Sequence, residues 1–267
     1  MFNTKNNETL AFCTAVKYTH KQTIITDYSS SPRLCHNLAF MLDGQAVIQS
    51  NGKQFTVKKG DIFFIPRHST YCAKWEVIGG CSCHSVHFNF TPNQDPFLNE
   101  TVPVQILPNE DFDTLYEHLK TLQAHQYEKN ANRFLALSAF YYLCGSLLPK
   151  VVVLQSQTKN SSISPALAFL ENNYTEHCSV EELASLCFLS PSRFYYLFKQ
   201  LTGYSPIVYK NRLTMQRVAQ TLLLDKDKSV ESISDEYGFE SPIYFRRLFK
   251  KITGKTPTQY RKEETLL

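Results

Sequence analysis

A ten-residue segment occurs twice in this chain, and the second copy lies a constant 51 residues after the first. Residues 190–199 read SPSRFYYLFK and residues 241–250 read SPIYFRRLFK. The correspondence continues without a break through a glycine to Tyr209 in the first copy and Tyr260 in the second. Because the register is kept across a predicted helix, a glycine stop and a turn, one supersecondary unit is used twice.

The bulk composition of the 267 residues predicts two ordinary folded domains or one large one. A hydrophobic content of 43% and an aromatic content of 13% support packed cores and exclude a disordered chain. We expect neither a secretory signal nor a transmembrane helix, because no basic segment precedes an apolar run and no such run reaches about 18 residues. Eight scattered cysteines then favour reduced thiols in a cytoplasmic protein over disulfides or redox sensing. The net charge of +4 is by itself weak evidence for a nucleic-acid partner.

Residues 10–92 alternate between short apolar runs and turn residues, which is typical of β-structure. Asp43-Gly44 and Asn51-Gly52 are hairpin signals between such runs. Evenly spaced short strands with hairpin turns predict a sandwich or a small barrel. We expect strands at 23–26, 37–42, 45–49, 54–57, 61–66 and 84–90.

One segment of this region resembles the second cupin motif, in which a glycine precedes a strand that ends in Pro-x-Gly-x-x-His. Residues 60–71 read GDIFFIPRHSTY, so His68 stands at the motif's glycine and Tyr71 at its metal-binding histidine. The paired histidines and the glutamate of the first cupin motif are not found. The resemblance implies a cupin-like barrel and argues against a metal enzyme, so we expect no cofactor and no metal.

Two cysteines and two histidines of one strand form a second candidate metal set. Cys81 and Cys83 share one face of the predicted strand, whereas His84 and His87 fall on opposite faces. The four side chains cannot converge on one ion without a bend, so we expect no metal here either.

A barrel of this size can hold one small molecule. Aromatic and polar side chains on its strands suit a sugar or a larger apolar acid. No basic residue is clearly directed into the barrel, which argues against a carboxylate. The side chains expected to contact the ligand, in the barrel or at its rim, are His36, Phe40, Phe64, His68, Tyr71, Trp75 and His84.

The hydrophobic period changes after Asn109. Apolar residues then recur at three- and four-residue spacing, which predicts two amphipathic helices within residues 110–148. Their apolar faces require burial either against the barrel or in a dimer interface, and the sequence leaves both open. The faces comprise Phe112, Leu115, Tyr116, Leu119 and Leu122 in the first helix, and Phe134, Leu137, Phe140, Tyr141, Cys144 and Leu148 in the second.

A polar stretch divides the chain. Residues 151–162 pass from four apolar residues into a run of Gln, Ser, Thr, Lys and Asn, which predicts a linker. We therefore expect an α+β, multidomain protein. Residues 1–150 form a cupin-like β-barrel followed by the helix pair, for effector sensing and dimerisation, and residues 163–267 form an all-α domain.

Each copy of the repeat is a helix with an apolar inner face and an outer stripe of short polar, aromatic or basic residues. A short helix and a tight turn precede each copy, which is helix-turn-helix geometry, at about 179–201 and 229–252. A helix of about 18 residues joins the two units and is ~27 Å long. A rigid linker helix of that length suits two recognition helices that enter successive major grooves ~34 Å apart.

The short helices that precede the two copies correspond at an offset of 50 instead of 51, which places one extra residue near Glu240. Gly238 supplies the backbone freedom that a tight turn requires in the second unit. Phe188 holds the same position in the first unit. The first turn must therefore be built differently or be strained.

Residues 163–262 resemble the DNA-binding domain of the AraC/XylS family of bacterial transcription regulators. The resemblance rests on residues 232–241 (SISDEYGFES), 244–251 (YFRRLFKK) and 254–261 (GKTPTQYR). Ser234 departs from the small alanine that the family favours. The barrel and helix pair match the family's common layout of an effector and dimerisation domain.

The resemblance implies specific roles for the outer stripes. We expect base contacts from Ser192, Tyr195, Tyr196, Ile243, Tyr244, Arg246 and Arg247. We expect phosphate contacts from Ser190, Lys199, Ser241, Lys250 and Lys251. Arg247 is the best candidate for a bidentate guanine contact, and Ile243 for a thymine methyl group.

The leading hypothesis is a sequence-specific regulator, an activator rather than a repressor by family habit, controlled by a sugar or another metabolite. Its partners would be double-stranded DNA, RNA polymerase and a second copy of the chain, and it would lie on the bacterial nucleoid when bound to DNA. One alternative is a regulator without a ligand, governed by abundance or by a protein partner. Another is a metallo-cupin enzyme with an appended binding domain.

Overall fold

The computed structural model describes residues 10–77, 79–91, 94–98, 100–128, 130–154 and 161–263. The chain divides into two compact units, Met1–Ser161 and Ser162–Leu267. Of the predicted linker, residues 155–160 lie outside the described residues.

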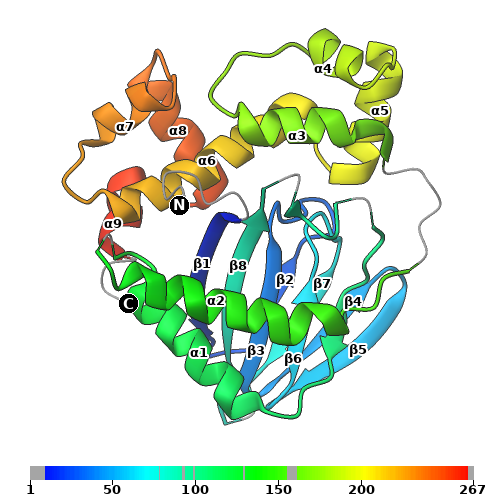
Figure 1. Cartoon of the computed structure of the whole chain (residues 1–267), viewed down its shortest axis with the longest axis vertical. Coiled ribbons are helices and arrows are strands. Elements are labelled where there is room, and N and C mark those ends of the chain that lie inside the picture. The colour runs from blue at the N-terminus through cyan, green and yellow to red at the C-terminus, as the bar shows by residue number, and fades with distance from the viewer. Residues whose placement is uncertain are drawn as a thin grey trace. The chain divides into compact units, whose positions relative to one another are not determined.

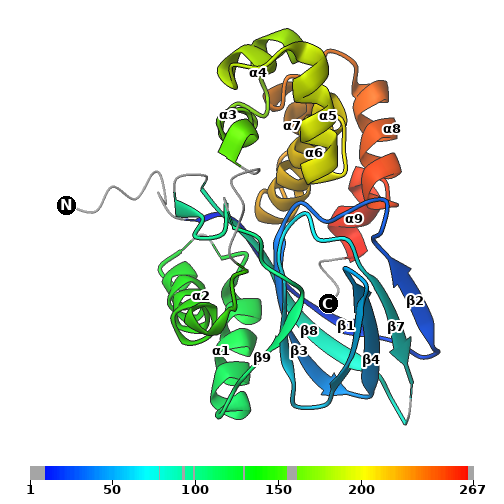
Figure 2. The same ribbon diagram turned by 90° about the vertical axis from the view of Figure 1, so that its right-hand side faces the viewer.

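The first unit contains two antiparallel sheets that face each other (Figures 1 and 2). The first sheet has the strand order β1 (Leu10–Thr19), β8 (Ser82–Phe90), β3 (His36–Asp43), β6 (Ile62–Ile65) and β9 (Gln105–Leu107). The second sheet has the order β2 (Ile24–Asp27), β7 (Cys72–Glu76), β4 (Gln45–Ser50) and β5 (Lys53–Lys58).

All six predicted strands are present, but three others were not singled out from the sequence. β1 lies at a sheet edge, and its sequence has no strong apolar alternation. β9 has only three residues, which is too short for an alternation to be recognised. β7 carries Lys74 and Glu76 on either side of Trp75, and this charged pattern hides the strand.

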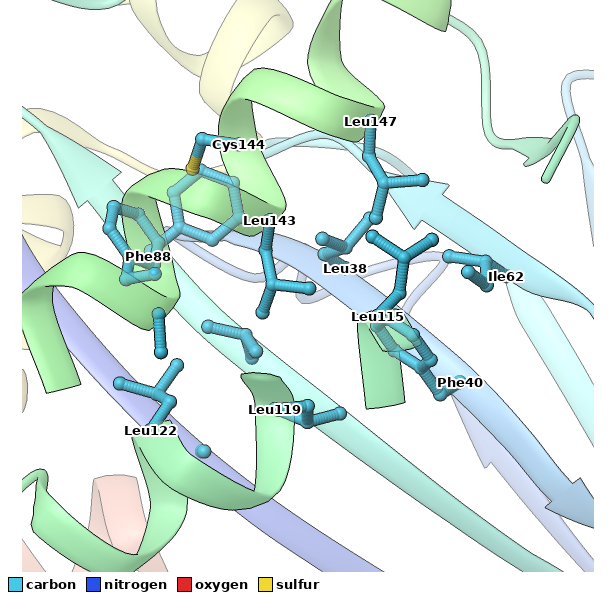
Figure 3. Packing of buried hydrophobic residues seen from close by; sticks show 14 of the residues in the cluster. Leu38, Phe40, Ile62, Phe88, Leu115, Leu119, Leu122, Leu143, Cys144 and Leu147 are labelled. Atoms are coloured by element: carbon cyan, nitrogen blue, oxygen red, sulfur yellow. The ribbon is translucent and has the colours of Figure 1, made fainter. Parts of the chain in front are cut away.

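Alternation along the strands of the first sheet creates two separate cores. Side chains between the two sheets form the inner core, which includes Met41, Phe63 and Cys83 from the first sheet and Ile48 from the second. Side chains on the opposite face of the first sheet form the outer-face core together with two helices. Figure 3 shows the outer-face core, with leucines of the helices against Leu38, Phe40 and Ile62 of the sheet. Because successive strand residues point to opposite faces, neighbours in sequence belong to different cores.

Helices α1 (Phe112–His125) and α2 (Arg133–Leu147) cover this outer face (Figure 2). Asp111 caps α1 by accepting a hydrogen bond from the Thr114 amide at 3.1 Å. Three side chains of the face that we considered for dimerisation, Leu115, Leu119 and Leu122, are buried in the outer-face core, and Phe112 and Tyr116 pack against it. The sequence left two arrangements open for this face, and the structure shows the one in which it packs on the barrel. The three leucine side chains are buried there and are not accessible to a second subunit.

The predicted inner face of α2 is partly wrong. Phe134 is 59% exposed and Tyr141 is 38% exposed, whereas Ala136, Ala139 and Leu143 are buried. The segment is apolar on every side, so its period does not single out one face. The small alanines, which carry little hydrophobic signal, lie against the sheet.

The second unit is all-helical and is built around its longest helix, α6 (Pro206–Leu224) (Figure 1). One helix pair lies at each end of α6, α4 with α5 and α7 with α8. The other helices are α3 (Ser164–Asn172), α4 (Val180–Leu186), α5 (Pro191–Thr202), α7 (Val230–Glu236), α8 (Pro242–Thr253) and α9 (Pro257–Glu263). Two short 3-10 turns, Leu148–Lys150 and Ser161–Ile163, are also present.

Candidate nucleic-acid interface and barrel interior

The two copies of the repeat have the same start in atomic detail. The Ser190 hydroxyl accepts a hydrogen bond from the Arg193 amide at 3.4 Å, and the Ser241 hydroxyl accepts one from the Tyr244 amide at 3.3 Å. Both serines are therefore helix N-caps, and each is followed by a proline at the first helical position. Their hydroxyl protons remain free to donate to a phosphate.

The ends of the two recognition helices also match. Gly203 and Gly254 close α5 and α8 in the left-handed region, with φ of 80° and 81°. The threonine before each glycine donates its hydroxyl to the carbonyl four residues back, at 2.7 Å in the first copy and 2.8 Å in the second. The sequence repeat is therefore a repeat of structure.

An aromatic contact fixes the inner face of each recognition helix. Phe198 meets the edge of Tyr209 with ring centroids 5.3 Å apart, and Phe249 meets Tyr260 in the same way at 5.6 Å. Both phenylalanines are fully buried. Such edge-on pairs add about 0.5–1.5 kcal/mol to the burial of the rings, so they hold both helices at a fixed rotation.

The turn of the first unit is strained, as one of our two expectations proposed. Phe188 adopts φ of 53° and is 96% exposed, and Gly238 holds the matching position at φ of 74°. The hydrogen bonds of the two turns correspond, Phe188 N to Ser185 O at 3.1 Å and Gly238 N to Asp235 O at 3.0 Å. The turn is therefore built in the same way in both units, and Phe188 adopts a conformation that favours glycine.

We expect Phe188→Gly to stabilise the protein by about 0.5–1 kcal/mol. A left-handed backbone costs a side-chain-bearing residue roughly 1–2 kcal/mol, the greater chain entropy of glycine offsets part of the gain, and the exposed ring loses no packing. Urea unfolding followed by far-ultraviolet circular dichroism measures the change. Gly238→Ala is the matched reverse change, and its added Cβ meets only an ordinary contact. The strain account fails if Phe188→Gly lowers stability or if Gly238→Ala is neutral.

Ser234 lies in α7 and is fully buried, and its hydroxyl has no hydrogen-bond partner among the described residues. Ala184 holds the matching position in α4 and is also buried. An unsatisfied buried hydroxyl costs roughly 1–3 kcal/mol. We expect Ser234→Ala to raise the free energy of unfolding by about 1 kcal/mol and Ala184→Ser to lower it by a similar amount, both measured by urea unfolding. If both substitutions changed the free energy of unfolding equally and with the same sign, this account would be contradicted.

The outer stripes of α5 and α8 face solvent. The expected DNA-contacting residues that are exposed are Ser190, Ser192, Tyr195, Tyr196, Lys199, Ser241, Ile243, Tyr244, Arg246, Arg247, Lys250 and Lys251. Ile243 is 78% exposed and lies among the other exposed residues of α8. The two recognition helices therefore present aromatic, apolar and basic groups to solvent.

The two arginines of α8 differ in their surroundings. A guanidinium nitrogen of Arg246 contacts the Glu231 carboxylate of α7. Arg247 forms no ion pair or hydrogen bond with any residue that the structure describes. On α5, the Arg193 guanidinium lies over the Tyr196 ring, 5.9 Å from its centre. Arg247 can therefore bind a ligand without first breaking a contact within the chain, unlike Arg246 and Arg193.

Comparison with known families fits this geometry. Residues 183–263 match the family described as a helix-turn-helix domain, and residues 19–88 match the one described as the cupin domain of mannose-6-phosphate isomerase. Over 247 residues the chain is 26% identical to the arabinose operon regulatory protein of Salmonella typhimurium, with 84% of this chain and 82% of that protein covered. The chain carries an AraC-type helix-turn-helix domain after a cupin domain, and its relatives are AraC-family transcription regulators.

A second relative and a solved structure are also similar to this chain. The lactose operon transcription activator of Staphylococcus xylosus is 30% identical over 135 residues, which span 49% of this chain and 48% of that protein. Crystalline ToxT from Vibrio cholerae O395 aligns over 96% of this chain and 99% of its own, with a TM-score of 0.62. Its identity of 10% makes this a likeness of fold alone. The cupin-like domain followed by a helical DNA-binding domain is confirmed.

The barrel places four of the seven expected ligand contacts on the wrong face. His36 and Phe40 of β3, Phe64 of β6 and His84 of β8 point away from the inner core. Phe40 and Phe64 belong to the outer-face core, the His36 ring stacks on Phe64 at 5.6 Å, and the His84 ring meets Tyr116 of α1 at 5.8 Å. Their predicted position inside the barrel is wrong, because even-numbered residues of these strands face the helices.

The other three expected contacts lie elsewhere. Tyr71 belongs to the inner core, and Trp75 packs against that core. His68 lies in the turn after β6 with φ of 63°. Tyr71 stands where the cupin motif has a metal-binding histidine, and its ring stacks on Tyr28 at 5.0 Å. A buried, stacked phenol does not fit a cupin metal centre.

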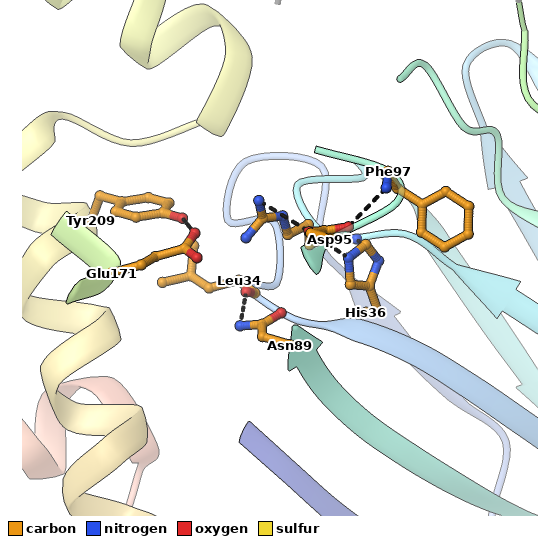
Figure 4. A network of polar contacts seen from close by, with 8 residues as sticks. Leu34, His36, Asn89, Asp95, Phe97, Glu171 and Tyr209 are labelled. Atoms are coloured by element: carbon orange, nitrogen blue, oxygen red, sulfur yellow. Dashed lines mark hydrogen bonds and ion pairs between the residues drawn. The ribbon is translucent and has the colours of Figure 1, made fainter. Parts of the chain in front are cut away.

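A buried ionic cluster was not predicted, because its members come from separate loops. The Asp95 carboxylate lies 3.2 Å from His36 Nε2 and 3.2 Å from Arg67 Nη2, and it accepts a hydrogen bond from the Phe97 amide at 2.9 Å (Figure 4). Burial opposes ionisation of Asp95, but His36 and Arg67 outweigh it and hold the pKa of this carboxyl well below its usual range. The cluster ties the loop after β8 to the starts of β3 and of the turn after β6.

His84 is the contrasting buried histidine. Neither of its ring nitrogens has a hydrogen-bond partner among the described residues. Burial lowers the pKa of His84 to about 4, with a smaller contribution from Lys17. The imidazole is therefore neutral at physiological pH and acts as a packing residue beneath α1.

Proposed function

We propose that this AraC/XylS regulator activates transcription and that a small effector bound by the barrel controls its DNA binding. The observation that carries the DNA-binding part is the structural repeat, with two solvent-facing stripes at the two ends of α6. Support for a ligand comes from relatives that carry the names of sugar operons and from ToxT, which was crystallised with an unsaturated fatty acid bound. The regulator acts in the bacterial cytoplasm, on the nucleoid when it is bound to DNA.

In the proposed complex, α5 and α8 each lie in a major groove. Ser192, Tyr195 and Tyr196 contact bases in one groove, and Ile243, Tyr244, Arg246 and Arg247 contact bases in the next. The lysines Lys199, Lys250 and Lys251 and the capping serines contact phosphates. Arg246 must leave Glu231 to reach a base, so Arg247 contributes more to sequence preference.

Homodimerisation stays a prediction. The large apolar side chains that the helix pair leaves exposed belong to α2, namely Phe134, Leu135, Tyr141 and Tyr142. His118 of α1 stacks on Tyr142 with ring centres 3.9 Å apart. A subunit interface formed by this pair would therefore use the outer surface of α2 instead of the predicted face of α1. Analytical ultracentrifugation of the wild type and of Leu135→Glu tests it.

We propose no catalytic activity. The metallo-cupin alternative lacks its histidine motif, and no group of three or more potential metal ligands occurs among the described residues. RNA polymerase remains the expected partner at the promoter. No helix in the described part of the chain is both long and apolar enough to cross a membrane.

Two measurements test the proposal. A reporter fused to promoters that the protein binds, compared between cells with and without the gene, distinguishes activation from repression. A thermal-shift screen of the full-length protein against sugars, fatty acids and small metabolites tests ligand control, and a hit should change affinity for the selected DNA. A ligand-independent regulator would show neither stabilisation by any ligand nor a change in DNA affinity.

A further inference from the structure

An arginine sits among tyrosines at one end of the inner core. Arg33 lies in the segment between β2 and β3, and its guanidinium is 4.5 Å from the centre of the Tyr28 ring and donates to the Tyr28 hydroxyl. Tyr28 in turn stacks on Tyr71, whose side chain is buried in the inner core. The sequence did not indicate any basic group in the barrel, and this placement of Arg33 corrects that expectation.

The charge of Arg33 has no counter-ion in the described part of the chain. The groups that interact electrostatically with it include Tyr18, Tyr28, Tyr71, Cys35, Cys83 and His87, and none of these is a carboxylate. Its Nε is buried and has no hydrogen-bond partner. Arg33 is half-buried and its guanidinium donates only to neutral phenols, whereas natural proteins usually pair a desolvated cation with a carboxylate. The same domain does so at Arg67, which meets Asp95 at 3.2 Å.

The phenol oxygens around Arg33 accept hydrogen bonds from its guanidinium, and each hydroxyl keeps its own proton to donate. Burial raises the pKa of the Tyr18 and Tyr71 hydroxyls, although Arg33 opposes the rise, so both stay protonated at neutral pH. The Tyr18 hydroxyl lies 3.0 Å from His87 Nε2. Burial, and after it Arg33, lowers the pKa of His87 well below its usual range, so this ring is neutral and adds no second charge. The cluster therefore combines one fixed positive charge with phenol donors and aromatic walls.

An open hollow of about 520 Å³ borders Tyr71, and its lining also includes Ser29, Gln49, Thr70 and the basic residue Lys53. Its volume is within the range of small-molecule sites, roughly 300–1,000 Å³. Tyr71 is the residue of the cluster that lines this hollow.

We propose that Arg33, with Tyr18, Tyr28 and Tyr71, binds the oxyanion group of a small organic effector, either a carboxylate or a phosphoryl group. A guanidinium presents two parallel donors that match such a group, and a desolvated site strengthens the pairing. The inference rests on the proposed effector control and deepens it, because it names the chemical class of the effector. It also excludes an uncharged sugar as the full ligand.

The first test uses simple anions and the full-length protein. Inorganic phosphate and acetate are titrated at constant ionic strength while thermal unfolding is followed. We expect at least one of them to raise the Tm of the wild type, and we expect the rise to be lost in Arg33→Met and partly kept in Arg33→Lys. The control variant Lys74→Met removes an exposed lysine, and we expect it to show the same anion-dependent rise in Tm as the wild type. No rise in the wild type, or an equal rise in Arg33→Met, overturns the proposal.

The second test distinguishes the two sources of the oxyanion. Glucose, gluconate and glucose 6-phosphate share a carbon skeleton and differ in their charged group. We expect at least one charged compound to bind at least tenfold more tightly than glucose, and we expect Arg33→Met to abolish the difference. The preferred anion identifies the group as carboxylate or phosphoryl, and tightest binding of glucose to both proteins contradicts the proposal.

DNA binding separates failure of this inference from failure of the proposed function. Arg33→Met should keep sequence-specific DNA binding in the absence of anions, which shows that the variant is folded. A failed anion test then counts against the oxyanion site alone, since the wild type would still be a DNA-binding regulator. Loss of DNA binding in Arg33→Met would contradict the assignment of Arg33 to ligand recognition.

Discussion

Arg247→Ala weakens binding to the selected DNA site by about 1–3 kcal/mol, which is roughly a fivefold to 150-fold loss of affinity, and it relaxes the preference at one base pair. Arg247 is exposed on α8 and has no ion-pair or hydrogen-bond partner among the described residues, so the substitution removes a DNA contact without disturbing the fold. Fluorescence anisotropy with the selected site and with single-base variants measures both effects.

Two variants of the same helix serve as controls. Lys250→Ala removes the same charge, but we expect it to weaken all sequences alike, because a phosphate contact carries no base information. Arg246→Ala should cost less than Arg247→Ala, because Arg246 is engaged with Glu231 before it binds DNA. Unchanged affinity and unchanged preference in Arg247→Ala would disprove the assigned orientation of α8.

Asp95→Ala destabilises the barrel domain by about 3–5 kcal/mol. The substitution leaves Arg67 buried without its carboxylate and removes the partner of His36, and breaking one side of a buried ion pair costs this much. Urea unfolding followed by the fluorescence of Trp75, the only tryptophan, reports on this domain. Glu117→Ala breaks the exposed pair with Lys120 on α1 and should have almost no effect.

The Asp95 effect depends on pH in a defined direction. The pKa of this carboxyl is lowered in the folded state, so its contribution is complete above the unfolded value of about 3.9 and is lost as the pH falls below it. The difference between the wild type and Asp95→Ala should therefore be constant near neutral pH and shrink in acid. A difference below 1 kcal/mol at neutral pH, or one that grows in acid, contradicts the role given to this cluster.

The helical domain was largely predictable because its signals are local. Caps, glycine stops and the helical period all lie within a few residues of one another, and the repeat supplies an internal check on each. The strain at Phe188 was visible as one of two alternatives because Gly238 occupies the same place in the second copy. The exposed stripes followed from the buried ones, since a helix that buries Phe245 and Phe249 must turn Arg247 outward.

The barrel interior was less predictable because its contacts are distant in sequence. Whether an even- or odd-numbered residue faces the ligand depends on which side of the sheet α1 and α2 cover, and a strand's own sequence does not contain that information when both faces are buried. His36 and Phe64 were misplaced for this reason. Arg33 and Asp95 lie in loops, where neither periodicity nor a motif indicates a direction.

The most direct test of the central claim is selection of binding sites by the full-length protein from random double-stranded DNA. The structure predicts enriched sequences with two short motifs whose centres lie about 10 base pairs apart, one for each recognition helix. Arg247→Ala should alter one motif and leave the other unchanged. Enrichment of no sequence, or of a single motif that Arg247→Ala does not alter, would contradict two helix-turn-helix units that read adjacent major grooves.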